Sequence, residues 1–328
     1  MKRMKAFVYE KYGSPDVLHL AEVEKPTPDD EEVLIQIRAV SINGSDKEGL
    51  IGKPLYARAD GLLKPRHKIL GSDIAGVVED VGKNHTAFKP GDEVFGELPG
   101  YMGGFAAYAC THGNTLTIKP AQLSFEEAAA IPQAGVLALQ IQKKGNLKPW
   151  HSILINGAGG SAGSFAIQMA KLCGAETTGV DHTDKLDFMR SLGADHVIDY
   201  TRENFTEDGN QVDLIFDLIA HNPVSAIQRA LRPNGTYFFI GGSVKVLFQI
   251  LFLGALIKRK TTKNIRFLAV QQSREDLIAV TNLCTTGKIK PIIDKQFVFA
   301  RLPEALRYVV EGRAKGKVVI NLDSVLST

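Results

Sequence analysis

Apolar residues follow two different patterns along the chain. In roughly the first 120 residues, short β-branched runs such as 33–40 and 74–81 are separated by Gly, Pro and Asp, which is typical of strands joined by turns. The pattern changes at Ser124, where SFEEAAAIPQAGVLALQ offers an N-cap serine, acidic residues in the first turn and then an alanine-rich stretch, and so predicts a helix. From Ile289 the chain returns to short strands and one helix, 303–310.

Strands and helices alternate in the middle of the chain. Short apolar runs predict the strands, and helix start and stop signals predict the helices between them. The predicted strands are 153–155, 177–180, 196–199, 213–217 and 236–240, and the predicted helices are 161–172, 184–192 and 223–231. Strands separated by helices of this length indicate an α/β fold with a doubly wound parallel sheet, covered on both faces.

The strongest local motif is a glycine-rich turn between the first of these strands and the first helix. Its sequence NGAGGSAG places Ala158, Gly160 and Gly163 in the spacing A-x-G-x-x-G. Small residues allow the bend, let a pyrophosphate approach the backbone and let the helix pack closely on the strand, while the first helical amides face the anion. We therefore expect a nicotinamide dinucleotide to bind at Ala158, Gly159, Gly160, Ser161, Ala162 and Gly163.

The choice between NADP(H) and NAD(H) stays open in the sequence. Asp181 ends the second strand of this region, where a carboxylate accepts hydrogen bonds from the adenosine ribose and repels a 2′-phosphate. Lys185 and Tyr200 follow and are positioned to reach a phosphate, although Lys185 also suits a solvated helix face. Ile240, Gly241 and Gly242 end a later strand at the edge of the sheet where ligands of such folds bind, so they are further candidates for cofactor binding.

Composition and charge exclude other classes of protein. The 328 residues include 39 Lys and Arg against 36 Asp and Glu, so the positive excess of a dedicated nucleic-acid-binding protein is missing. Cys110, Cys173 and Cys284 are too few and too far apart for a disulfide framework or a CxxC zinc site. The N-terminus has no apolar signal-peptide core. We expect a cytoplasmic protein with reduced thiols and no nucleic-acid partner.

Several motifs, taken in order, resemble one known family. They are MKAFVYEKYGSPDVL, SINGSD, ILGSDIAGVVEDVG, FKPGDEVFG, the glycine-rich turn, LGADHVIDY and GKVVI. The chain resembles the medium-chain dehydrogenase/reductase superfamily, in its zinc-free quinone oxidoreductase-like branch. The resemblance implies a GroES-like β-rich catalytic domain made of residues 1–125 and 270–328, a Rossmann NAD(P)-binding domain at 126–269, an active site in the cleft between them, and a homodimer.

The resemblance also bears on metal binding. Zinc relatives hold the catalytic metal through Cys and His at positions that match Asn43, Ser72 and Gln133 here. Amide and hydroxyl oxygens are poor zinc ligands, and the segment 96–104, which matches the structural-zinc lobe, has no cysteine. We expect no metal. Without a Lewis acid for an alkoxide, we expect NAD(P)H-dependent reduction of a quinone or an enone or 2-alkenal; the alternatives are alcohol oxidation and a non-catalytic cofactor-binding protein that associates with nucleic acid or membrane.

The resemblance places the catalytic groups at the start of SINGSD. Asn43 is expected to hydrogen-bond the substrate carbonyl or the nicotinamide ribose, with Ser45 and Asp46 shaping its surroundings; the alternative for Asn43 is an amide that caps a loop. Quinone reductases carry a tyrosine five residues beyond the asparagine, and this chain has Glu48 there. A tyrosine proton donor would have to come from a loop, as Tyr56 or Tyr101. Further cofactor contacts implied by the family are Phe267, Leu268, Ala269 and Lys317.

One apolar segment, 244–257, is followed by the basic residues 258–260. With fourteen residues it is too short to cross a bilayer. Three uses compete: a lid over an apolar substrate, a packed or oligomeric surface, and contact with a membrane surface. Together with loops 50–65 and 96–104, this segment is expected to shape the substrate pocket.

Overall fold

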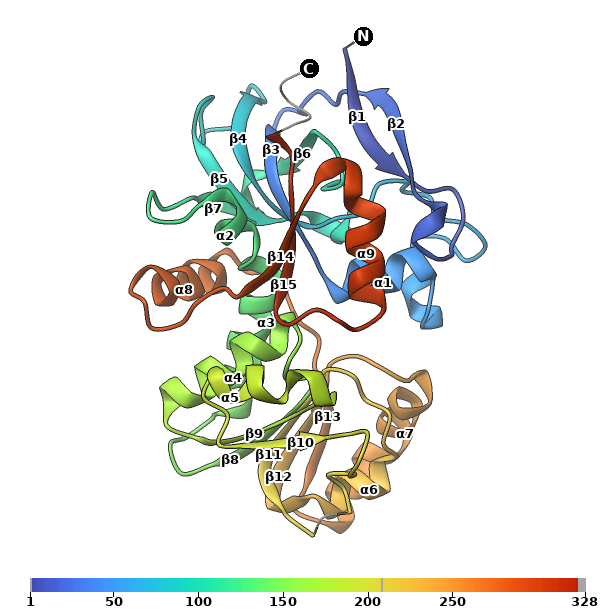
Figure 1. Ribbon diagram of the computed structural model, residues 1–328, viewed down its shortest axis with the longest axis vertical. Helices are drawn as coiled ribbons and strands as arrows, with labels where there is room; N and C mark the ends of the chain where they lie inside the picture. The colour runs from blue at the N-terminus through green and yellow to red at the C-terminus, as the bar shows by residue number, and fades with distance from the viewer. Residues whose placement is uncertain (1, 208, 324–328) are drawn as a thin grey trace. The chain divides into compact units, whose positions relative to one another are not determined.

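The protein is described here by a computed structural model, which describes residues 2–207 and 209–323, with all side chains in these ranges except those of residues 101, 253, 255, 256 and 258–260. The chain forms two compact units (Figure 1). Unit 1 consists of Met1–Val136, Gln272–Gly287 and Pro291–Thr328, and unit 2 of Leu137–Gln271 and Lys288–Lys290. Unit 1 is therefore assembled from both ends of the chain, and unit 2 from its middle.

Unit 1 is built on a mostly antiparallel sheet. The strands run in the order β14-β15-β3-β4-β5-β7, with β6 also paired to β3 and only β14 and β15 parallel to each other. Their bounds are β3 Glu32–Ile42, β4 Asp73–Val81, β5 Glu93–Glu97, β6 Tyr108–His112, β7 Leu116–Ile118, β14 Ile293–Val298 and β15 Lys317–Asn321. A separate hairpin joins β1 (Arg3–Val8) to β2 (His19–Glu24). The C-terminal strand β15 thus pairs with β3 near the N-terminus.

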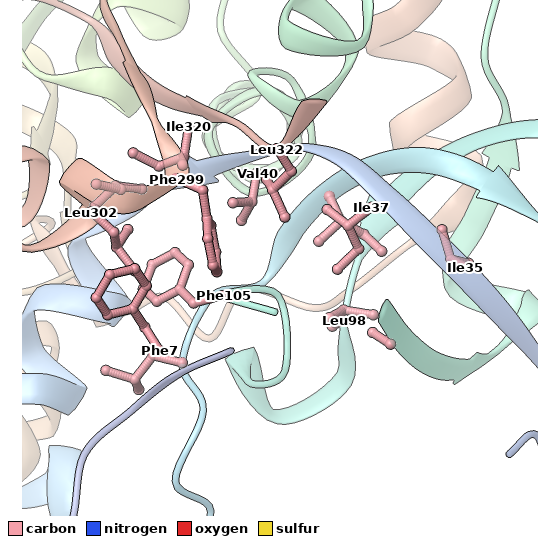
Figure 2. Packing of buried hydrophobic residues seen from close by; sticks show 14 of the residues in the cluster. Phe7, Ile35, Ile37, Val40, Leu98, Phe105, Phe299, Leu302, Ile320 and Leu322 are labelled. Carbon is pink, nitrogen blue, oxygen red and sulfur yellow. The ribbon is translucent and has the colours of Figure 1, made fainter. Parts of the chain in front are cut away.

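The core of unit 1 is formed by aromatic and β-branched side chains from distant parts of the sequence. Phe7 meets Phe299 edge to face with ring centroids 5.1 Å apart, and Phe105 packs with them in Figure 2. Ile35, Ile37 and other residues of the central strands are fully buried beside them. This packing ties the two ends of the chain into one unit, because hydrophobic burial is the main force that stabilises it.

Four helices flank this sheet within the described residues: α1 (Gly44–Ile51), α2 (Phe125–Ala129), α8 (Arg274–Thr285) and α9 (Leu302–Val310). The predicted N-cap is confirmed: the Ser124 hydroxyl accepts from the Glu127 amide at 3.1 Å, and the Glu127 carboxylate accepts from the Ser124 amide at 2.9 Å. Helix α2 packs on β3 and β4, so residues 126–129 belong to unit 1. The units change over within α3 (Pro132–Gly145), later than the predicted boundary at 125–126.

Unit 2 contains the predicted doubly wound parallel sheet, which confirms the expected fold class. All neighbouring strands are parallel, in the order β10-β9-β8-β11-β12-β13. The bounds are β8 Ser152–Asn156, β9 Glu176–Asp181, β10 His196–Asp199, β11 Val212–Asp217, β12 Leu231–Phe239 and β13 Asn264–Phe267. The chain winds outwards in both directions from β8, so right-handed crossovers place α4 (Ser161–Cys173) and α5 (Leu186–Ser191) on one face and α6 (Val224–Arg229) and α7 (Val244–Lys260) on the other (Figure 1).

The apolar segment forms helix α7, which packs against β13. Val246 and Ile250 are buried, whereas Phe248, Leu251 and Phe252 are 53%, 62% and 73% exposed. The helix therefore presents one apolar face to unit 2 and carries further apolar side chains outside it. The basic residues 258–260 have side chains outside those that the structure describes. Within the described chain, none of the helices combines the length and apolar character required to cross a membrane.

Candidate active site

The glycine-rich turn joins β8 to α4 as predicted. Gly157 has a positive φ of 86°, which favours glycine. A Cβ on Gly163 would lie 2.4 Å from the Gly157 carbonyl oxygen and 2.5 Å from the Ala158 Cα, so a side chain cannot enter without moving the backbone. The first amides of α4 have no partner within the helix and can bind an anion. The turn therefore fits the pyrophosphate of a dinucleotide.

Asp181, Lys185 and Tyr200 come together beside this turn. The Gly159 amide donates to Asp181 Oδ2 at 2.9 Å, and Lys185 Nζ lies 3.5 Å from Asp181 Oδ1. The Tyr200 amide donates to the Asp181 carbonyl at 3.2 Å, because β9 and β10 end side by side. Lys185 is only 8% exposed, so the interpretation as a solvated helix face is wrong. It ends a 3₁₀ turn, Thr183–Lys185, that precedes α5, where a single helix over 184–192 is predicted.

The other predicted cofactor residues of unit 2 lie at the same edge of the sheet, since its strands are parallel and each segment follows a strand. Gly242 has a φ of 124°, and a Cβ there would meet the Ala220 amide nitrogen at 2.4 Å. Leu268 is buried, and its amide donates to the Phe239 carbonyl at 2.9 Å. Phe267 is about half exposed. The residues gathered at this edge are Ala158–Gly163, Asp181, Lys185, Tyr200, Ile240, Gly241, Gly242, Phe267, Leu268 and Ala269.

A buried network at this edge was missed by the sequence reasoning. Asn156 Nδ2 donates to Asp217 Oδ1 at 2.8 Å, and the Tyr237 hydroxyl donates to Asp217 Oδ2 at 3.0 Å. Burial raises the pKa of Asp217 to about 6. The sequence does contain a signal for this network: a carboxylate ends an apolar strand, and a buried charge needs hydrogen-bond partners. The network links the carboxyl ends of β8 and β11, at the point where the sheet changes its winding direction.

A second polar cluster lies in unit 1, around the start of α1. The Asn43 backbone N–H donates to Asp46 Oδ2 at 2.7 Å, and the Gly71 backbone N–H donates to Asp46 Oδ1 at 3.0 Å. Asp46 is fully buried, and burial raises its pKa to about 7. Both carboxylate oxygens of Asp46 therefore accept hydrogen bonds from backbone N–H groups. Asp46, predicted as a catalytic residue together with Asn43 and Ser45, fixes the turn that carries Asn43.

A buried lysine joins this cluster from the other end of the chain. Lys317 Nζ donates to Asn43 Oδ1 at 2.7 Å and pairs with Asp73 Oδ2 at 3.1 Å. Lys317 and Asp73 are both 0% exposed, and Asn43 Nδ2 donates to Ser72 Oγ at 3.2 Å. Lys317 was predicted among the cofactor residues, but it lies in unit 1, and its contact with a cofactor stays a prediction. Asp73 was missed, although a carboxylate in the apolar run ILGSDIAGVV already required a buried partner.

Gln133 extends the cluster through both its backbone and its side chain. Its amide donates to Asp73 Oδ2 at 3.1 Å, its Nε2 donates to Glu97 Oε1 at 2.8 Å, and the Ser45 hydroxyl donates to its Oε1 at 3.1 Å. Burial, reinforced by the negative charge of Asp73, raises the pKa of Glu97 to about 8. Ser45 and Asn43, two predicted catalytic residues, are thus connected through one hydrogen-bonded network.

A cavity of about 550 Å³ opens beside this cluster, within unit 1. Ser45, Glu48, Tyr56 and Met102 are among the residues that line it, so loops 50–65 and 96–104 both contribute. Tyr101 has a side chain outside those that the structure describes. The wall is mostly apolar with few polar groups, which is typical of a small-molecule site.

The described residues offer neither a metal-binding cluster nor, at Cys110 and Cys284, an activated thiol. Among residues 2–207 and 209–323, no three His, Cys, Asp or Glu side chains are grouped so that they could hold a metal ion. Burial raises the pKa of Cys110 and of Cys284 to about 12, and the Cys173 thiol donates to the Leu147 carbonyl at 3.4 Å. Neither Cys110 nor Cys284 has the lowered pKa of a nucleophilic cysteine.

Two known domain families match this chain. Residues 29–123 match the alcohol dehydrogenase GroES-like domain, and residues 192–320 match a domain described as zinc-binding dehydrogenase. The chain belongs to the medium-chain dehydrogenase/reductase superfamily, in the quinone oxidoreductase-like branch. It is an oxidoreductase that uses a nicotinamide cofactor.

Similar proteins match over almost the full chain. A 2-methylene-furan-3-one reductase from Solanum lycopersicum is 36% identical over 97% of this chain and 79% of its own length. An NADPH-dependent alkenal/one oxidoreductase from Arabidopsis thaliana, a chloroplastic protein, is 32% identical over 97% of this chain and 80% of its own. The structure of a quinone oxidoreductase from Coxiella burnetii is 27% identical, with a TM-score of 0.88 and coverage of 98% of this chain and 100% of that one.

Proposed function

We propose that this oxidoreductase reduces a quinone or an α,β-unsaturated aldehyde or ketone with NADPH or NADH, and that it does so without zinc. The names of the tomato, Arabidopsis and Coxiella proteins support this class of substrate. When bound, the reduced nicotinamide supplies the hydride. The chain's own part is to bind the cofactor, orient the substrate carbonyl and supply a proton.

The environment of Asn43 carries this proposal. Its Oδ1 accepts from the buried Lys317 ammonium at 2.7 Å, and its Nδ2 is the group that can donate to a ligand. Nδ2 has two hydrogens, and the bond to Ser72 uses one of them. The ammonium polarises the amide and strengthens its remaining N–H as a donor. Asn43 is therefore suited to hold a carbonyl oxygen on which negative charge develops.

The same cluster supports reduction without a metal. Asn43, Ser72 and Gln133 offer amide and hydroxyl groups, which bind zinc poorly compared with thiolate and imidazole. These groups already bond to one another or to Lys317, Asp73 and Glu97. An enolate or hydroquinone anion is a much weaker base than an alkoxide, so hydrogen-bond donors suffice to stabilise it. Oxidation of a simple alcohol would lack the electrophile that its alkoxide needs.

The dinucleotide is proposed to lie along the carboxyl edge of the unit 2 sheet. The turn at Gly157–Gly163 fits its pyrophosphate, and Asp181, Lys185 and Tyr200 are placed to contact the adenosine ribose. Gly241 and Gly242 would let the backbone approach the nicotinamide. The affinities of NADPH and NADH, measured separately by fluorescence titration, decide which form is used.

The test of the proposed function is oxidation of NADPH and NADH, each against a quinone, a 2-alkenal and, in reverse, a simple alcohol. We expect turnover with the quinone or alkenal, unchanged after dialysis against a chelator, and a loss of kcat of at least tenfold for Asn43→Ala. Exposed Asn84→Ala is the matched control. Tight cofactor binding with no turnover of any acceptor would favour the non-catalytic binding protein, and chelator-sensitive alcohol oxidation would favour an alcohol dehydrogenase.

The proposed assembly is a homodimer formed through unit 2. Strand β13 ends the sheet order beyond β12, so it offers an edge to which a second copy can pair. Helix α7, which packs against β13, brings the exposed Phe248, Leu251 and Phe252 near that edge. Light scattering should report a dimer that Leu251→Lys weakens. A monomer that sediments with anionic liposomes at low salt would instead favour membrane contact.

The cytoplasmic location stays a prediction, which cell fractionation tests.

A further inference from the structure

An ionisable side chain that has no part in the network of Asn43 and Lys317 faces the cavity of unit 1. Glu48 lies one helical turn beyond Ser45 on α1, and both line the 550 Å³ cavity. Residues three apart on a helix share a face, so the cavity wall displays a hydroxyl and a carboxyl side by side. Apolar residues such as Leu70 and Met102 line the same space. Glu48 is half-buried there.

The surroundings of Glu48 shift its pKa in opposing directions. Burial is the largest influence and raises its pKa above the ordinary value, while the charge of Lys47 and a hydrogen bond from the Tyr56 hydroxyl oppose that rise. Tyr56 also lines the cavity. The Tyr56 hydroxyl therefore holds the Glu48 carboxyl at the wall of the cavity.

Other charged groups near Glu48 are paired among themselves. Asp60 and His67, which line the same cavity, form a pair with 2.5 Å between Oδ1 and Nδ1. On α9, which packs against α1, Glu304 pairs with Arg301 at 2.5 Å. Arg58, from the 3₁₀ turn that packs on α1, donates to the Gly52 carbonyl at 2.9 Å.

Arg307 is the remaining charged group of the described α9 helix; it pairs with Asp16. The other buried carboxyls of unit 1 are unsuited to meet a ligand. Both oxygens of Asp46 accept backbone amides, and Asp73 is tied to Lys317. Glu97 Oε1 accepts from Gln133 Nε2 at 2.8 Å. Among the described residues, two carboxyls line the cavity, and Asp60 is paired with His67, so Glu48 is the one left beside Ser45 and Tyr56.

We propose that Glu48 is the proton donor of the reduction, with Tyr56 as the residue that positions it. The inference rests on the proposed function. Hydride adds two electrons to the β-carbon of the enone, and the C=C π pair moves to form the enolate, whose oxygen is held by Asn43. The O–H bond of Glu48 then breaks, its proton forms a C–H bond at the α-carbon, and Glu48 is left as a carboxylate. Solvent returns the proton, so one hydride and one proton are consumed in each turnover.

The proposal predicts that the need for Glu48 differs between enone and quinone substrates. Protonation of an enolate at carbon is slow and benefits from a positioned acid, which contributes about 10²–10⁴-fold. A hydroquinone anion takes its proton on oxygen, which water supplies quickly. Loss of Glu48 should therefore slow the reduction of an enone much more than that of a quinone.

The first experiment compares Glu48→Gln with Glu31→Gln, an exposed control. Glutamine keeps the acceptor for Tyr56 but has no acidic proton. We expect kcat for a 2-alkenal to fall roughly 100-fold, with KM and NADPH affinity within about twofold of the wild type and quinone reduction within a few-fold. Equal rates in the wild type and Glu48→Gln, or equal losses for both acceptors, would overturn the assignment.

Two further variants guard against a purely structural effect. In Glu48→Ala, formate or acetate should restore part of the alkenal activity, because a small acid fits the vacated space; no rescue would count against the proposal. In Tyr56→Phe, removal of the bond that lowers the Glu48 pKa should move the alkaline fall of kcat/KM to higher pH. A fall at the same pH in Tyr56→Phe would also overturn it.

A readout without turnover is available by infrared difference spectroscopy. The spectrum of the wild type minus that of Glu48→Gln isolates the carbonyl band of protonated Glu48, because Asp46 and Glu97 contribute equally to both. The band should fade as the pH rises, at a higher pH than the carbonyl band of an exposed carboxyl. If the wild type reduces neither quinone nor alkenal, the proposed function fails; if it reduces both and the variants behave as the wild type, only the role of Glu48 fails.

Discussion

The two regions proposed to carry the chemistry differ in the groups that they offer: one offers backbone atoms, and the other offers buried side chains. In unit 2 the glycine-rich turn offers backbone atoms, and its specificity lies in the absence of side chains: a Cβ on Gly163 would meet the backbone at 2.4 Å. In unit 1 the cluster around Asn43 consists of buried side chains held by the Lys317 ammonium. The first region is damaged by adding atoms, and the second by removing a charge.

The largest expected effect comes from removing that charge. Lys317→Met leaves Asp73 buried without its cation, and breaking a buried pair in this way costs about 3–5 kcal/mol of stability. Urea unfolding measures the loss, with exposed Lys11→Met as the matched control. The double variant Lys317→Met with Asp73→Asn should recover part of the stability. A loss below about 1 kcal/mol would mean that the pair is not buried in solution.

Adding a methyl group to the turn is the converse change. Gly163→Ala forces the backbone of α4 away from the Gly157 carbonyl, and overpacking of this kind costs about 1–3 kcal/mol. Calorimetry and fluorescence titration should show a lower melting temperature and weaker binding of NADPH or NADH. Gly160→Ala is the control for stability, because its Cβ would lie 3.4 Å from the nearest atom. Equal stability of the two variants would contradict the assigned packing.

A smaller effect, on cofactor preference, is expected at Asp181, whose side chain accepts a hydrogen bond from the backbone of the glycine-rich turn. Asp181→Ser removes a negative charge beside the adenosine ribose, which should raise the ratio of NADPH to NADH affinity by about tenfold, or roughly 1.4 kcal/mol. Exposed Asp187→Ser serves as control. An unchanged ratio would remove Asp181 from the cofactor site.

The smallest expected change concerns only the pH dependence of stability. The pKa of Glu97 is raised to about 8 from 4.5, so its contribution is fully present below pH 4.5 and is lost as the pH rises through 8. Glu97→Gln keeps an acceptor for Gln133 and removes this titration. Compared with the wild type, the variant should gain stability between pH 5.5 and 8.5 in thermal unfolding. Parallel curves would show that Glu97 is ionised throughout.

The two regions also differ in how far the sequence predicted them. The glycine-rich turn and its strands follow local rules, and β10 has the predicted bounds of 196–199. Short helix α1 was missed, since GSDKEGLI has no apolar stripe. The pairing of Lys317 with Asn43 joins residues 274 positions apart; no local pattern encodes it, and only the pairing of β15 with β3 creates it. The Lys185 side chain likewise fills the space above Gly159, where an added Cβ would lie 2.7 Å from the Lys185 Cδ.

Two cysteines, the partly buried Cys110 and the buried Cys284, have a property that matters for an enzyme of this proposed class. Conjugated carbonyl compounds are electrophiles that alkylate thiolates, and the thiolate rather than the thiol is the attacking form. With pKa values near 12, Cys110 and Cys284 remain almost entirely protonated at neutral pH. Burial thereby keeps both of these side chains in the less reactive thiol form, in a protein proposed to handle electrophiles at every turnover.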